Sequence, residues 1–201
     1  MKYDIVLASG SPRRKEILSQ VGASFRVVVS DCDETTDCTE PAKMVQILSE
    51  RKAEAVAELI DGPAVILGAD TVVASGQEIL GKPGNAERAK QMLHMIEGHR
   101  HAVYTGVCIF IKEADQSFRK LAFTEKTEVT VAKMSEREIC EYAESGEPND
   151  KAGAYAIQGR FAAFIEGMDG DYYNVVGLPI AGIYSRLRDA GIDLRTGESL
   201  K

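Results

Sequence analysis

The sequence is poor in the features that mark several protein classes. It has only four cysteines, which are Cys32, Cys38, Cys108 and Cys140. They form no C-x-x-C pair, and their spacing fits neither a zinc site nor a disulfide framework. No apolar run is long enough to span a membrane, and the N-terminus lacks a basic region followed by a long apolar stretch. We therefore expect reduced thiols in a cytoplasmic protein without a membrane partner.

Positive charge is also scarce. The chain carries 24 lysines and arginines against 31 aspartates and glutamates, a net charge of −7. This balance argues against a nucleic-acid partner bound by counterion release, although a local basic pocket can still hold a small anion. A length of 201 residues with 44% hydrophobic and 27% charged residues indicates a soluble protein of one domain, or of two small lobes around one core.

Segments with strand character alternate with amphipathic segments of helix length. We expect strands at 3–8, 25–29, 65–73, 79–80, 103–111 and 123–131, with further strand material in 162–177. We expect helices at about 12–21, 40–60, 86–97, 136–145 and 179–190. Because hairpins occur among the alternating strands and helices, the predicted class is α/β with a mixed sheet, in a single domain over residues 1–201.

Residues 9–14, with the sequence SGSPRR, join the first strand to the first helix. Free backbone N–H groups, the positive end of the helix dipole and two guanidinium groups meet there, which favours a phosphate ligand. The candidate residues for contacting it are Ser9, Ser11, Arg13 and Arg14. Adjacent helical residues project about 100° apart, so one arginine should face the ligand and the other serve another purpose. The alternative is a helix capped by Ser11 with surface arginines.

Asp70 interrupts an otherwise apolar strand. Burying an unpaired charge is expensive, so this acid should be hydrogen-bonded, paired with a cation or bound to a metal. If Ser75 and Gly76 centre a hairpin, Lys82 lies one step from the position opposite Asp70. A shift of one register position would place it opposite Thr71. The alternatives are an aspartate that caps a turn or helix and an exposed lysine at a strand end.

Two further charged residues have unusual settings. Lys52 lies on an apolar helical stripe, from which it can either extend to water or point into an anion-filled cleft. Glu34 follows Asp31 and Asp33 in a predicted loop. Because Mg²⁺ uses few carboxylates plus substrate phosphates, one of these acids together with Asp70 can hold a divalent ion. A solvated acidic loop is the alternative.

Residues 150–159, DKAGAYAIQG, are rich in glycine and alanine. Small residues permit close approach of the backbone, and Gln158 offers both donors and an acceptor, which suits the edge of a nucleobase. The alternative is a structural turn with its polar side chain in water.

Five motifs, in this order, resemble the Maf family of nucleotide pyrophosphatases, also called septum formation inhibitor proteins. They are LASGSPRR at 7–14, GADT at 68–71, GKP at 81–83, DKAGAY at 150–155 and VVGLP at 175–179. The resemblance covers essentially the whole chain. It implies an elongated mixed sheet with helices, related to the inosine triphosphate pyrophosphatases, with two lobes around a cleft and often a homodimer. It also implies metal-dependent hydrolysis of a nucleoside triphosphate to the monophosphate and pyrophosphate.

The resemblance also suggests residue roles. The family's proton acceptor corresponds to Asp70, and the specificity positions of the branch that acts on dTTP and UTP correspond to Arg13, Thr71 and Gln158. The sister branch, which prefers 7-methylated GTP, carries other residues at these places. The sequence matches the first branch at all three.

These inferences give one main hypothesis. The chain is expected to be a house-cleaning pyrophosphatase for dTTP, UTP and modified uridine triphosphates. Lys52 and Lys82 would neutralise phosphate charge, and Glu34 would help Asp70 to hold Mg²⁺, Mn²⁺ or Co²⁺. A nucleotide-binding regulator of cell division that acts through a protein partner, and a general phosphomonoesterase, are the alternatives.

Overall fold

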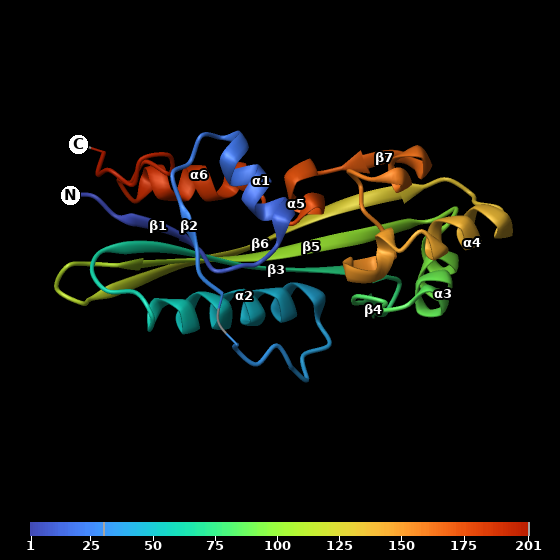
Figure 1. The fold of residues 1–201 in the computed structure, drawn as a ribbon, viewed down its shortest axis with the longest axis horizontal. Coiled ribbons are helices and arrows are strands. Elements are labelled where there is room, and N and C mark those ends of the chain that lie inside the picture. The colour runs from blue at the N-terminus through green and yellow to red at the C-terminus, as the bar shows by residue number, and fades with distance from the viewer. Residues whose placement is uncertain (30, 201) are drawn as a thin grey trace. The chain divides into compact units, whose positions relative to one another are not determined.

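A computed structural model describes residues 1–29 and 31–200 (Figure 1). Among them, seven strands form one sheet in the order β2-β1-β3-β5-β6-β7, with β4 paired to β3. The strands are β1 (Asp4–Leu7), β2 (Arg26–Val27), β3 (Ala64–Ser75), β4 (Glu78–Leu80), β5 (Arg100–Lys112), β6 (Phe118–Val131) and β7 (Ile165–Asp169). β1 runs parallel to β2 and β3, whereas β4 and β7 run antiparallel to β3 and β6. The predicted mixed sheet is confirmed.

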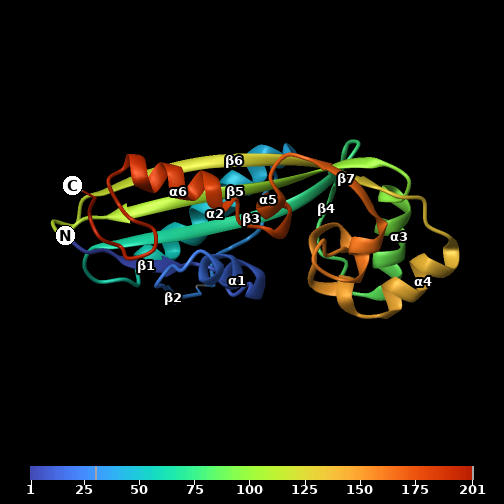
Figure 2. The same ribbon diagram turned by 90° about the horizontal axis from the view of Figure 1, so that it is seen from above.

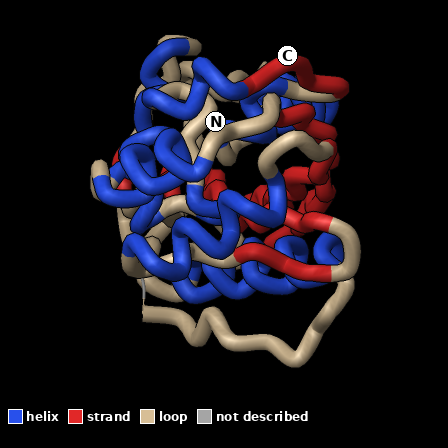
Figure 3. The backbone as a smooth tube through the Cα atoms, turned by 90° about the vertical axis from the view of Figure 1, so that its right-hand side faces the viewer, coloured by secondary structure: helices blue, strands red, loops and turns tan. Residues whose placement is uncertain are grey.

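The helices begin where the sequence supplies a start signal. They are α1 (Pro12–Gln20), α2 (Pro41–Ala57), α3 (Ala86–Ile96), α4 (Glu136–Glu144), α5 (Tyr172–Val176) and α6 (Ile180–Asp189), with 3₁₀ turns η1 (Glu147–Asp150), η2 (Ala152–Ala154) and η3 (Arg160–Phe164). Proline opens α1 and α2. The side chain of Asn85 caps α3, and Ser135 with Glu138 forms a capping box at the start of α4. Residues 31–40, before α2, form neither helix nor strand (Figure 3).

The chain divides into two compact units. The first contains Met1–Asp70, Thr105–Glu125 and Gly177–Lys201, and the second contains Thr71–Tyr104 and Lys126–Val176. In the first unit, α2 lies against one face of the sheet, and α1 and α6 lie on the other (Figures 1 and 2). The N-terminal and C-terminal segments of the chain both belong to this unit and are hydrogen-bonded to each other: the backbone N–H of Tyr3 donates to the carbonyl of Gly197 at 2.8 Å.

Two glycines let α2 pack closely on the sheet of the first unit. A Cβ at Gly68 of β3 would lie 2.2 Å from the carbonyl oxygen of Ser49, and one at Gly106 of β5 would lie 2.3 Å from that of Val45. Both distances are too short for any side chain, so the helix backbone rests directly over these positions. The packing fixes the height of α2, and therefore of Lys52, above β3.

Each unit has its own apolar core. In the first unit, side chains of β1, α2, β3, β5 and the residues next to them form a cluster that contains Val6, Ala8, Ala53, Val56, Ala57, Ile60, Ala64, Ile66, Cys108 and Phe110. In the second, a cluster contains Val73, Leu80, Leu93, Ile96, Val103, Val129, Ile139, Tyr142, Tyr155 and Phe161, among others. All four cysteines are free, as predicted. Among the described residues, no helix is both long and apolar enough to cross a bilayer.

The strand prediction for 162–177 was only partly right. This segment contains β7, but η3 precedes the strand and α5 follows it. The aromatic and β-branched sequence of α5 favours a strand locally. The helix forms because Asp171 accepts a hydrogen bond from the Tyr173 N–H at 2.8 Å, while buried Asn174 donates to the Val103 carbonyl and the Thr127 hydroxyl. The predicted strand at 25–29 is also shorter, at Arg26–Val27.

Candidate functional site

Asp70 lies within β3 with its side chain only 13% exposed. Its Oδ1 accepts a hydrogen bond from Nζ of Lys52 at 2.6 Å. Asp70, the acid in the apolar strand, is therefore paired with a cation. A cation pair is one of the three alternatives by which its burial was expected to be compensated.

Lys52 joins two acids in the first unit. Its side chain is 14% exposed, and its Nζ lies 2.6 Å from Asp70 and 2.9 Å from Oε2 of Glu34, whose side chain is 60% exposed. The lysine thus leaves the apolar stripe of α2 toward carboxylates instead of extending into water. Helix α2, strand β3 and the loop at 31–40 each supply one member of this charged group.

Arg14 fixes the backbone next to this group. Its Nε donates to the carbonyl of Gly177 at 2.8 Å, and its Nη1 donates to the Ser9 hydroxyl at 3.0 Å and to the Ala69 carbonyl at 2.8 Å. Burial lowers the pKa of Arg14, and the nearby Asp70 carboxylate opposes that shift. Arg14 therefore ties the end of β1 to the strand residue that precedes Asp70.

The remaining residues of the SGSPRR turn lie around Arg14. The N–H of Ser11 donates to the Ser9 hydroxyl at 3.3 Å. Ser11 occupies the N-cap position of α1, but its side chain forms no capping hydrogen bond, so the alternative of a helix capped by the Ser11 side chain was wrong. Arg13 lies partly exposed on the first turn of α1.

The hairpin that leads to Lys82 has a different register from the one first predicted. The paired residues are Val73 with Leu80, Ala74 with Ile79 and Ser75 with Glu78. The turn is therefore at Gly76 and Gln77, and the predicted turn centred on Ser75 and Gly76 was wrong. Continuing this register would put Lys82 opposite Thr71, but β4 ends at Leu80. Lys82 is exposed and, among residues 1–29 and 31–200, forms no hydrogen bond or ion pair.

Two predicted motifs meet in the second unit. The N–H of Gly153 donates to the carbonyl of Gly81 at 3.1 Å, which joins the DKAGAY segment to GKP. Gly153 has a φ of +68°, and a Cβ there would lie 2.6 Å from the Val73 side chain, so only glycine fits. Gln158 is exposed in a turn closed by a 3.0 Å hydrogen bond from the Gly159 N–H to the Ala156 carbonyl.

The predicted site residues are distributed over both units. The first unit holds Ser9, Ser11, Arg13, Arg14, Glu34, Lys52 and Asp70, and the second holds Thr71, Lys82 and Gln158. Sequence reasoning did not single out Glu147, whose carboxylate accepts hydrogen bonds from the Tyr142 hydroxyl and the Arg160 N–H. Its only sequence signal is its position, three residues before the segment 150–159.

The acids of the first unit are suited to a divalent cation. Asp70 and Glu34 already share one cationic group, the ammonium of Lys52, and Mg²⁺ prefers carboxylate oxygens. Among the described residues, no group of three or more His, Cys, Asp or Glu side chains could hold a metal. Two carboxylates are therefore what the chain offers here, and the other ligands would be water and substrate phosphates.

Solved structures provide partial likenesses. The Ham1 protein of Staphylococcus aureus aligns with 64% of this chain and 72% of its own at a TM-score of 0.39 and 14% identity. A HAM1 protein from Coxiella burnetii aligns with 66% and 74%, at a TM-score of 0.41 and 13% identity. Likenesses at these TM-scores are too partial to establish a shared fold.

Sequence relatives are much closer. The chain is 51% identical over 192 residues to a dTTP/UTP pyrophosphatase of Lachnoclostridium phytofermentans, covering 96% of this chain and 98% of the relative. It is 48% identical over 203 residues to a dTTP/UTP pyrophosphatase of Agathobacter rectalis, covering 94% and 98%. A protein of the same name from Bacillus cereus is 47% identical over 191 residues, covering 94% and 97%. The profile of the Maf-like protein family matches residues 4–190, and the chain therefore belongs to the Maf family.

Proposed function

We propose that this chain hydrolyses dTTP and UTP to the corresponding monophosphate and pyrophosphate. The names of its relatives support this substrate class. The observation that carries the proposal is the Lys52 ammonium held between Asp70 and Glu34. This group puts a proton acceptor, a cation and potential metal ligands together, which is what the hydrolysis of a phosphoanhydride requires.

The proposed reaction is attack of water on the α-phosphorus. The water oxygen forms a bond to the α-phosphorus, the bond from that atom to the oxygen bridging the β-phosphorus breaks, and pyrophosphate leaves. Asp70 takes the proton of the attacking water. Its Oδ1 is engaged by Lys52, and among the described residues its Oδ2 has no hydrogen-bond partner, so Oδ2 is the oxygen that accepts the proton.

The charges of the first unit would offset those of the triphosphate. Lys52 stabilises the negative charge that develops on the phosphate oxygens. Asp70 and Glu34 would hold the divalent ion, Mg²⁺, Mn²⁺ or Co²⁺, which when bound neutralises phosphate charge and makes water a better nucleophile at neutral pH. Lys52 contacts one oxygen of each acid, so the lysine and the ion would share these two carboxylates.

The other predicted residues would bind and select the substrate. Ser9 and Ser11 form the turn that would receive phosphate at the start of α1. Arg14 is hydrogen-bonded to the protein's own backbone, so it shapes this turn. Arg13, partly exposed on the first turn of α1, would contact the substrate.

The residues of the second unit have the remaining roles. Lys82, exposed at the GKP segment, supplies further positive charge for phosphate. Thr71 and Gln158 read the pyrimidine, since their side chains offer both donors and acceptors.

A panel of nucleoside triphosphates tests the proposed function. The purified protein is incubated with dTTP, UTP, CTP, ATP and GTP and with Mg²⁺, Mn²⁺ or Co²⁺, and pyrophosphate and orthophosphate are measured separately. We expect pyrophosphate from dTTP and UTP, and none when the metal is chelated. Orthophosphate as the first product would indicate a phosphomonoesterase. Tight nucleotide binding without turnover would favour the regulator.

We also propose that the protein works in the cytoplasm as a homodimer. The free cysteines fit a reducing compartment. Sedimentation equilibrium tests the second part, and a mass near the monomer's 21.9 kDa at micromolar concentration would contradict it.

A further inference from the structure

The turn that carries Gln158 is exposed, but both of its flanks are anchored. Tyr155 and Ala156 before it are buried, and Phe161 after it is fully buried. The rings of Tyr155 and Phe161 pack with their centroids 4.8 Å apart. Between them, Gln158 and Arg160 face solvent. The position of Gln158 therefore depends on what holds the short segment 156–160.

Two side chains from outside this segment hold its ends. The hydroxyl of Tyr142, from α4, accepts a hydrogen bond from the Ala156 N–H at 3.3 Å and donates to Oε1 of Glu147 at 3.0 Å. The same Oε1 accepts from the Arg160 N–H at 3.0 Å. The Tyr142 hydroxyl and the Glu147 carboxylate, hydrogen-bonded to each other, thus connect the backbone N–H groups at the two ends of the turn. Burial and the nearby Glu147 carboxylate raise the pKa of Tyr142, so the hydroxyl keeps the proton that it donates.

The carboxylate also fills the space beneath the turn. A Cβ at Gly159 would lie 2.1 Å from Oε1 of Glu147. The residue after Gln158 must therefore be glycine for as long as Glu147 keeps its position. The carboxylate and the backbone at 159 are in direct contact, so a movement of one requires a movement of the other.

We propose that Tyr142 and Glu147 form a clamp that positions Gln158, and that this clamp sets the selectivity of the enzyme for uracil and thymine over other bases. The inference rests on the proposed function, in which Gln158 reads the base. Uracil and thymine present an imide edge, which a side-chain amide can match with one donor and one acceptor. A glutamine on a flexible turn could also form hydrogen bonds with the edges of other bases. Discrimination between bases therefore requires the backbone that carries the glutamine side chain to be held in one position.

The clamp is tested by the ratio of kcat/KM for UTP to that for CTP and ATP. Tyr142→Phe keeps the ring, which packs 5.2 Å from the ring of Phe161, but loses both hydrogen bonds. Glu147→Ala removes the acceptor. We expect each to lower the ratio about 10-fold, the effect of one to two lost hydrogen bonds, mainly through a higher KM for UTP. Glu147→Gln keeps an Oε1 acceptor and should retain a ratio close to that of the unmodified enzyme.

A double variant separates the clamp from general loss of structure. Gly159→Ala should lower the ratio because its new methyl group collides with Glu147. In the Glu147→Ala background the collision is gone, so the double variant should be no worse than Glu147→Ala alone. Additive losses would overturn the proposed contact. Circular dichroism and the melting temperature of each variant show that the comparison is made on folded protein.

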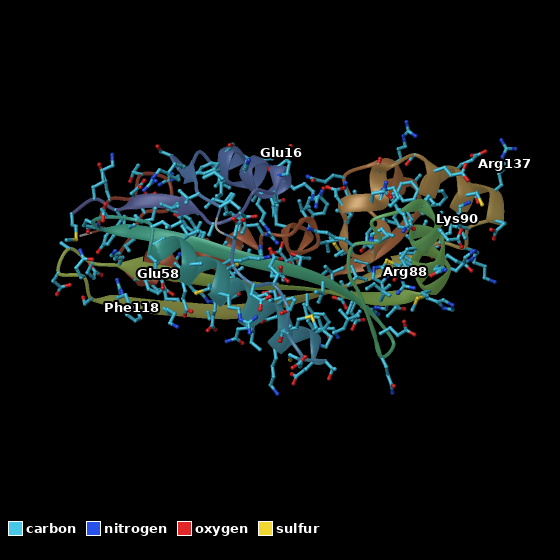
Figure 4. The ribbon with its side chains drawn as sticks, turned by 60° about the horizontal axis from the view of Figure 1, so that its bottom comes forward. Glu16, Glu58, Arg88, Lys90, Phe118 and Arg137 are labelled. Atoms are coloured by element: carbon cyan, nitrogen blue, oxygen red, sulfur yellow. The ribbon has the colours of Figure 1, made fainter. Side chains whose placement is uncertain are left out.

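Glu141→Gln is the matched control. This acid lies on α4 like Tyr142, but its side chain is 61% exposed, and within residues 1–29 and 31–200 its one ion pair is with the 86% exposed Arg137. Figure 4 shows the Arg137 side chain projecting outward from α4. The control should leave both the ratio and KM unchanged.

The outcomes distinguish the clamp from the proposed function. If the unmodified enzyme releases no pyrophosphate from UTP or dTTP, the proposed function fails. If it does so, and Gln158→Ala lowers the ratio while Tyr142→Phe and Glu147→Ala do not, the clamp is wrong. A ratio that Gln158→Ala leaves unchanged overturns base reading by Gln158, and the clamp with it.

Discussion

Asp70 is the residue on which the proposed chemistry depends. Asp70→Asn keeps an oxygen that can accept the Lys52 hydrogen bond, so the fold should be preserved. The amide cannot take a proton from water, and we expect turnover to fall by about 10²–10⁴-fold. Pyrophosphate release under saturating UTP measures the loss, and the melting temperature provides the control. A variant that retains near-normal turnover would show that another group accepts the proton.

Gln158 can be tested independently of the clamp. Its side chain is exposed, so Gln158→Glu should change the melting temperature little. The carboxylate has lost the amide's donors, and we expect the order of preference among dTTP, UTP and CTP to change. Competition assays with mixed nucleotides measure this order directly. An unchanged order would remove Gln158 from the specificity residues.

His101 gives the folded state a dependence on pH. It is buried, and its Nε2 lies 2.8 Å from the Tyr155 hydroxyl. Burial lowers its pKa from 6.5 to about 4. Between these values the unfolded chain binds a proton that the folded chain does not, so the free energy of unfolding is lost as pH falls from about 6.5 toward 4. The shift corresponds to about 3 kcal/mol.

Denaturant unfolding at pH 7 and pH 4.5 measures this effect. His101→Gln cannot titrate but can still reach the Tyr155 hydroxyl, so the difference in stability between the two pH values should shrink. His99→Gln, at an exposed position, is the control and should leave the difference as it is. If both variants behave alike, other groups carry the pH dependence.

At the scale of residues, the sequence revealed the charges that conflict with their surroundings. Asp70 and Lys52 were identifiable because each interrupts an apolar pattern, and the structure pairs them. The first register predicted for Lys82 was wrong, because a turn centred one residue later changes every pairing that follows. The alternative register, with Lys82 opposite Thr71, is the one that the observed pairing continues. Tyr142 and Glu147 are ordinary residues for a helix and a turn, and their connection to segment 156–160 exists only in three dimensions.

Among the elements, α2 and β3 determine the geometry of the charged group. Gly68→Ala would place a methyl group 2.2 Å from the Ser49 carbonyl oxygen, so the helix must move outward. We expect a loss of about 1–3 kcal/mol in the free energy of unfolding, typical of overpacking. Because Lys52 moves with the helix, kcat should also fall at least tenfold.

Urea unfolding and steady-state kinetics test this prediction together. Gly167→Ala is the matched control, since Gly167 also lies in a strand and a Cβ there has open space around it. It should be close to neutral in both measurements. A Gly68→Ala variant with normal kcat would show that turnover does not depend on the distance at which α2 holds Lys52 from β3.

Helices and strands were predicted correctly from local sequence signals where no tertiary interaction opposed those signals. Pro12, Asn85 and Ser135 mark the starts of helices predicted near residues 12, 86 and 136, which the structure confirms. α5 was missed because tertiary hydrogen bonds of Asn174 outweigh a strand-like composition. The strand predicted at 25–29 was longer than β2 because the neighbouring apolar residues also have strand character. In the structure, β2 pairs with β1 over only two residues.

For the whole molecule, the acidic balance raises the question of how a triphosphate binds. The net charge is −7, but the Debye length is about 8 Å at physiological salt. Charges farther away are screened, so under the proposed function the local cations and a divalent ion would decide the binding. By the same reasoning, we expect the binding of dTTP to depend on a divalent metal ion even when no reaction follows.

Thermal unfolding of Asp70→Asn should show this dependence on metal, with Glu34 as the remaining acid. A nucleotide that binds only the folded state at 100 times its dissociation constant stabilises it by about 2.7 kcal/mol, which for a chain of this size is about 5–10 °C in melting temperature. We expect this shift with dTTP and Mg²⁺, and a smaller one with dTTP and EDTA or with ATP and Mg²⁺. Equal shifts for dTTP and ATP would mean that the folded protein does not select the base when it binds. An equal shift in EDTA would mean that the protein's own cations hold the phosphates without a divalent ion.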